Sequence, residues 1–72
     1  MNVHAKIAEV FRAAIENPEN KDVFGSPNWD FVEADVLFGV GVDNVVENMG
    51  SLSVFFEYFA ELVDVQVALE AA

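Results

Sequence analysis

The chain has 72 residues, 54% of them hydrophobic, and 13 Asp and Glu against three Lys and Arg give a net charge of −10. This length fits one small domain spanning residues 1–72, and the high apolar content excludes a disordered chain. The strong acidity argues against direct binding to nucleic acids or to anionic membranes, and the lack of cysteine excludes disulfides and thiol chemistry.

The charges are divided unevenly along the sequence. Lys6, Arg12 and Lys21 are the only basic residues, and the chain from residue 22 onward carries ten acids and no Lys or Arg. Such a segment cannot form internal salt bridges and is expected to attract a basic surface or a cation.

We find no secretory signal, and the longest apolar run, residues 36–42, is too short to span a bilayer. We therefore expect a soluble cytoplasmic protein.

The first predicted element is an amphipathic helix over residues 3–16. Its apolar face repeats at helical spacing. This face consists of Val3, Ile7, Val10, Phe11, Ala14 and Ile15. Asn17-Pro18 ends the helix, because a residue before proline avoids the helical conformation. Residues 17–28 are rich in turn formers and predict a connector, in which Val23 and Phe24 are expected to tuck into the core.

Residues 29–42 allow two interpretations. Ser26 as N-cap and Pro27 at the first helical position predict a helix that buries Trp29, Val32, Val36 and Leu37 and ends at Gly39. The strict alternation of apolar residues from position 32 to 42 instead predicts a strand. We prefer the helix because a strand here would have a pairing candidate only near residues 63–69.

The last third of the chain predicts two more helices. A short one over residues 43–49 is expected to be capped by Asp43 and closed by Gly50. A long one over residues 51–70 has Ser51 or Ser53 as its N-cap. The fold class is therefore all-α, a bundle of three to four helices with a long C-terminal helix; the alternative is α+β with strands near 31–42 and 63–69. Six aromatic residues are expected to dominate the core or a subunit interface: Phe11, Phe24, Trp29, Phe55, Phe56 and Phe59.

The long helix has an uneven circumference. At 100° per residue, Glu57, Glu61 and Asp64 fall within an arc of about 60°, and the remaining arc is apolar. We predict that these acids bind a partner, together with Asp30, Glu33 and Asp35 of the preceding segment. The apolar arc predicts a core or oligomer interface. Its candidate residues are Phe55, Phe56, Tyr58, Phe59, Leu62 and Val63.

Enzyme chemistry has little support in this sequence. A Ser- or Cys-based site needs a nucleophile and a base, and the only imidazole is His4, near the N-terminus. No zinc spacing, calcium loop or glycine-rich phosphate loop is present, so we expect no enzyme, cofactor or metal.

The chain resembles acyl carrier proteins in size, charge and helix content. Their modified serine follows an Asp, whereas here Gly50-Ser51-Leu52 stands at the comparable place, so we carry no modified serine over.

We therefore expect a non-enzymatic interaction protein whose acidic face binds and inhibits a basic, nucleic-acid-binding partner. In composition and size the chain is similar to DNA mimics and inhibitors from phages and mobile elements. A structural or regulatory homo-oligomer, a homodimer for example, is the second hypothesis, in which the acids only keep the assembly soluble. An acidic carrier or ion-binding protein is the third.

Overall fold

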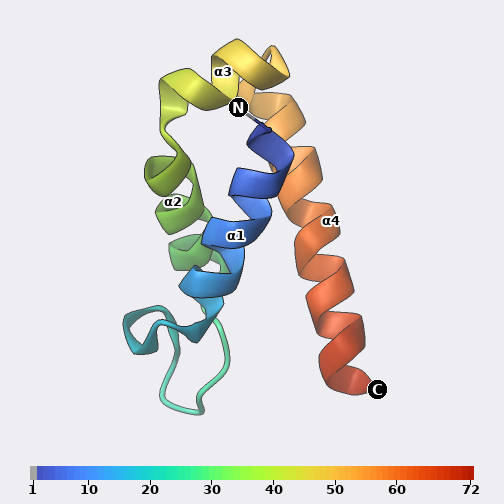
Figure 1. Ribbon diagram of the computed structural model, residues 1–72. Coiled ribbons are helices and arrows are strands. Elements are labelled where there is room, and N and C mark those ends of the chain that lie inside the picture. The colour runs from blue at the N-terminus through green and yellow to red at the C-terminus, as the bar shows by residue number, and fades with distance from the viewer. Residues whose placement is uncertain (1) are drawn as a thin grey trace.

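The computed structural model describes residues 2–72, which form four α-helices and a 3₁₀ turn. The elements are α1 (Val3–Glu16), η1 (Pro18–Asn20), α2 (Trp29–Val40), α3 (Val42–Met49) and α4 (Leu52–Ala71) (Figure 1). The all-α prediction with a long C-terminal helix is confirmed. The α+β alternative is wrong, because residues 31–40 and 63–69 are helical and the only β-pairing in the described chain is a bridge between Lys21 and Pro27.

The helices form an elongated bundle of 36 × 24 × 18 Å. In Figure 1, α1 lies between α2 and α4, the short α3 crosses one end, and the connector between α1 and α2 forms the other end. The final turns of α4 extend away from α1 and α2. On α2 and on α4, the side that faces away from α1 is therefore not covered by another described helix (Figure 1).

Local capping signals set most of the helix ends. The Asn2 side chain accepts from the Ala5 amide at 3.1 Å, and the Ser51 hydroxyl accepts from the Val54 amide at 3.3 Å. Asn17 ends α1 before Pro18, and Gly50 ends α3 with φ at +89°, a left-handed conformation that favours glycine. The predicted bounds of α1 and the predicted Ser51 cap are confirmed.

Three predicted boundaries of the middle helices are wrong. Asn28 caps α2 in place of Ser26, whose amide and carbonyl are both used in hydrogen bonds to Asp22 within the connector. Gly41, with φ at +101°, ends α2 in place of Gly39, and it also serves as the N-cap of α3 in place of Asp43. Each difference arises because a second capping residue of suitable chemistry lies within two residues.

Gly39 has a packing role instead of a terminating one. A Cβ atom built on it would lie 2.9 Å from Cγ1 of Val10. Real Cβ atoms do not come this close to another carbon, so the missing side chain lets α2 approach α1 closely. This explains why a glycine stands one residue before the end of a continuous helix, a position that is unfavourable for helix propensity.

The core is formed by a stripe of residues from each of α1, α2 and α4 and by one residue of α3. Its buried apolar residues are Val3, Ile7, Phe11, Ala14, Val32, Val36, Val40, Val45, Phe55 and Phe59. Phe11 of α1 connects α4 with α2, because its ring lies edge-on to Phe59 at a centroid distance of 5.7 Å and stacks with Trp29 at 6.1 Å. The predicted burial of Val23 and Phe24 is wrong, since these side chains are 93% and 90% exposed.

Asn20 is the one buried polar residue among those described. Its Nδ2 donates to the Ala14 carbonyl at 3.0 Å and to Oδ2 of Asp35 at 2.8 Å. The backbone carbonyl of Asn20 accepts from the backbone amide of Asn28 at 2.7 Å. This residue therefore ties the end of α1, the connector and the side of α2 together.

Candidate functional site

The structure places all three acids of the predicted α4 stripe on the surface. Glu57, Glu61 and Asp64 are exposed, whereas Phe55 and Phe59 of the same helix are buried. At 100° per residue the acids lie opposite the two buried rings, so they face away from the bundle. Glu57 and Glu61 are one turn apart, about 6 Å along the helix axis. The helix therefore presents a row of carboxylates directly to solvent.

The three predicted acids of α2 do not share one face. Asp30 and Asp35 are exposed and Glu33 is half-buried, and Asp35 lies on the opposite flank of the buried Val32–Val36 stripe from Glu33. Asp35 also accepts the hydrogen bond from Asn20 and so has a structural role. In Figure 1, α1 separates α2 from α4, so the structure gives two acidic regions. That all six acids act on one partner stays a prediction.

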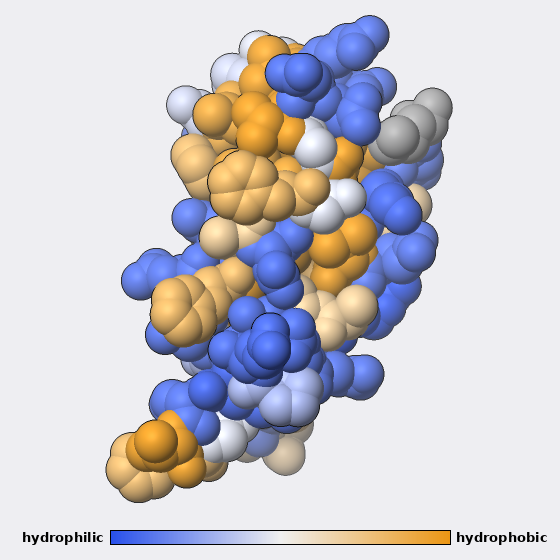
Figure 2. Space-filling model, turned by 90° about the vertical axis from the view of Figure 1, so that its left-hand side faces the viewer, coloured by the Kyte–Doolittle hydropathy of each residue, from blue (hydrophilic) through white to orange (hydrophobic). Residues whose placement is uncertain are grey.

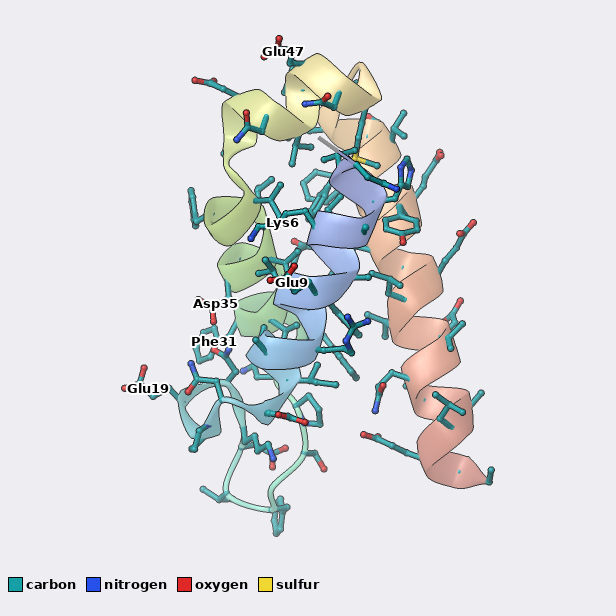
Figure 3. The ribbon with its side chains drawn as sticks, viewed as in Figure 1. Lys6, Glu9, Glu19, Phe31, Asp35 and Glu47 are labelled. Atoms are coloured by element: carbon teal, nitrogen blue, oxygen red, sulfur yellow. The ribbon has the colours of Figure 1, made fainter. Side chains whose placement is uncertain are left out.

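The chain offers very few internal cations to these acids. Across residues 2–72 the single ion pair joins Lys6 Nζ to Glu9 Oε1 at 3.8 Å, within α1. Figure 3 shows the two side chains on the front of α1, beside α2. The acids of α2, α3 and α4 have no Lys or Arg on their own helices.

The predicted interface residues of α4 divide into two groups. Phe55 and Phe59 belong to the core of the single chain, with Tyr58, Leu62 and Val63 packed against it. The Tyr58 ring meets the His4 ring edge-on at 4.8 Å, which fixes the start of α1 against α4. Phe56 lies at the surface. Most of the candidate oligomer interface is therefore already used inside one chain.

Sequence reasoning missed a surface on α2. The Phe31 and Phe38 side chains are 57% and 74% exposed, although α2 buries Val32 and Val36. We use the name "outer apolar face" for Phe31 and Phe38 together with Val23 and Phe24 of the connector. Figure 2 shows hydrophobic groups over α2 and at the connector end, separated by hydrophilic ones. The seven-residue spacing of Phe31 and Phe38 was the available signal, because residues at this spacing share a helix face.

Hydrogen bonds hold the connector end in place. Oδ1 of Asp22 accepts from the amides of Phe24 at 2.8 Å and Ser26 at 3.0 Å. The Asp22 amide donates to the Ser26 carbonyl at 2.8 Å, and Gly25 has φ at +82°. This local network favours one shape of the turn, so Val23 and Phe24 are directed outward by a defined backbone.

Several kinds of site are absent from the part of the chain that the structure describes. No pocket lies among residues 2–72, and no three His, Cys, Asp or Glu side chains there are grouped to hold a metal ion. The described helices include none with the length and apolar character needed to cross a membrane.

Comparison of the chain with protein-family models, with curated proteins and with solved structures found no match.

Proposed function

We propose that this protein is a non-enzymatic binding protein whose acidic exterior docks on the basic surface of a nucleic-acid-binding protein and inhibits it. The observation that carries the proposal is the run of ten acids without a single Lys or Arg from Asp22 to Ala72. Those carboxylates repel one another in the free protein. A cationic partner relieves that repulsion. The field of the carboxylates also attracts the partner toward the acidic surface over several ångströms.

The α4 stripe is the best-placed part of this exterior. Glu57 and Glu61 are both exposed, and like charges one turn apart destabilise a helix by a few tenths of a kcal/mol. Their spacing of about 6 Å along the axis is close to that of successive phosphates on a nucleic-acid strand. A protein surface that binds phosphates with Lys and Arg can bind such a row of carboxylates, and nucleic acid is then excluded from it.

The salt dependence of binding tests this function. Proteins captured from native-cell lysate are identified, purified and measured individually by biolayer interferometry at about 50 mM and about 500 mM NaCl. We expect association to slow tenfold or more at the higher salt and in a Glu57→Lys/Glu61→Lys variant. We also expect the captured protein to lose its nucleic-acid binding when this protein is added.

A matched variant controls for net charge. Glu9→Lys/Glu16→Lys changes the charge by the same amount on exposed positions of α1, and we expect a clearly smaller effect on the association rate. Binding that is insensitive to salt for every captured protein contradicts the proposed function. An equal effect of the two charge reversals assigns the attraction to overall charge and rejects the α4 stripe.

Self-association is a second candidate function, favoured by the final turns of α4. Val65 and Leu69 are 58% and 66% exposed, and α4 has no fully buried residue after Phe59. Two copies that pack these turns together would cover them. Light scattering over a concentration series up to about 100 μM is expected to show a dimer that a Val65→Ser/Leu69→Ser variant loses. A monomer at every concentration rejects this candidate.

A further inference from the structure

The core fixes which side of α2 faces outward. Val32, Val36 and Val40 are buried against the rest of the bundle, and Gly39 lies directly against Val10. Phe31 and Phe38 therefore point away from α1 and cannot turn inward without undoing that packing. They are two helical turns apart, about 10 Å along the axis.

The rim of this face has a net negative charge. The exposed acids nearest in sequence are Glu19 and Asp22 in the connector and Asp30 and Asp35 on α2, against the single base Lys21. Figure 3 shows Glu19, Phe31 and Asp35 on the same side of the molecule. Lys6 and Glu9, which lie beside α2, pair with each other and add no net charge. Aromatic anchors surrounded by charged residues are the usual anatomy of a protein-binding surface.

Charge complementarity limits what can cover this face. A second copy that docks through this same face would bring its own rim acids against the identical acids of the first copy. Lipid headgroups and nucleic acids that carry negative charge are repelled for the same reason. The complementary surface has apolar side chains bordered by Lys and Arg. An amphipathic helix laid along α2 provides this, because its own apolar residues repeat every two turns, as Phe31 and Phe38 do.

We propose that the outer apolar face is the anchoring site for a basic amphipathic helix of the partner protein. This inference rests on the proposed function and adds to it the surface and the partner segment. Phe31 and Phe38 enter the apolar side of that helix, and the connector end with Val23 and Phe24 contacts its extension. Asp30 and Asp35 face its Lys and Arg. The α4 stripe then accelerates encounter, while the outer apolar face determines how long the complex lasts.

Synthetic peptides test the inference without the natural partner. The probe is a helical peptide with a Leu face flanked by Lys, and its controls are the same peptide in scrambled order and a version with Glu in place of Lys. Binding to the full chain is followed by amide chemical-shift changes and by fluorescence anisotropy. We expect the largest shift changes at residues 22–25 and 30–38, and at least tenfold weaker binding of both control peptides.

Variants assign the effect to the face. Phe31→Ala/Phe38→Ala is expected to weaken peptide binding at least tenfold, whereas Val65→Ala/Leu69→Ala, which truncates side chains of similar exposure on α4, leaves it within twofold. Amide spectra of both variants establish that each is folded. Shift changes concentrated on α4, or equal losses in the two variants, overturn the inference.

The remaining outcomes separate this inference from the proposed function. Salt-sensitive binding that Glu57→Lys/Glu61→Lys weakens and Phe31→Ala/Phe38→Ala does not overturns the anchoring site and supports the proposed function. Binding that depends on Phe31 and Phe38 and is equally strong for the Lys and Glu peptides shows no preference for a basic partner. That result overturns the basic partner in this inference and in the proposed function. A dimer that Phe31→Ala/Phe38→Ala dissociates assigns the face to a second copy and overturns the inference.

Discussion

Replacement of Phe55 by Ala is expected to destabilise the domain by about 3–5 kcal/mol. The Phe55 side chain is fully buried, and its ring contacts Phe59 at a centroid distance of 6.1 Å and Phe56 at 5.4 Å. Removal of the ring loses its burial and leaves a cavity at the point where α4 meets the core. The total free energy of unfolding of a domain is only about 5–15 kcal/mol. Urea unfolding followed by circular dichroism should therefore show that this variant loses a large part of its stability.

Phe38→Ala is the matched control for this prediction. It makes the same chemical change inside a helix, but the Phe38 side chain is 74% exposed, so the free energy of unfolding should fall by less than about 1 kcal/mol. Similar losses for the two variants would contradict the description of the core. They would mean that the outer side of α2 is covered in solution.

The second large effect is expected for Asn20→Asp, which changes one atom type at nearly constant shape. The Asn20 amide donates to the Ala14 carbonyl and to the Asp35 carboxylate. A buried carboxylate in its place has no proton to donate, and it faces two acceptor oxygens, one of them charged. An uncompensated buried charge costs about 3–5 kcal/mol, and we expect unfolding experiments at neutral pH to show a loss of that size.

Asn48→Asp serves as the control, because its Nδ2 donates to the Asn44 carbonyl at an exposed site. That variant should change stability by less than about 1 kcal/mol at neutral pH. The effect of Asn20→Asp should also shrink near pH 3, where carboxyl groups bind a proton and can donate a hydrogen bond. A loss that is equal at the two pH values would show that the charge is not its cause.

The candidate site was predictable where it depends on a single helix. The helical repeat alone places Glu57, Glu61 and Asp64 on one side, and the structure has them exposed there. Asp35 was not predictable in the same way, because its hydrogen bond comes from Asn20, fifteen residues earlier in the chain. The role of such a residue depends on a contact between elements that no local pattern records.

By itself the sequence determined the charge distribution, the helical class and most of the helix ends. Asn17-Pro18, Gly50 and Ser51 act on their immediate neighbours through backbone geometry and capping hydrogen bonds, so their effects can be derived from local chemistry. The helical interpretation of residues 29–42 also predicted the buried side of α2 correctly, but only the tertiary structure decided that Phe31 and Phe38 stay exposed. Apolar residues occur on every side of α2, between its three acids, and packing against α1 buries Val32 and Val36 and leaves Phe31 and Phe38 exposed. The hydrophobic effect has no direction of its own, so in a helix with apolar residues on every side the neighbouring helices determine which of those residues are buried.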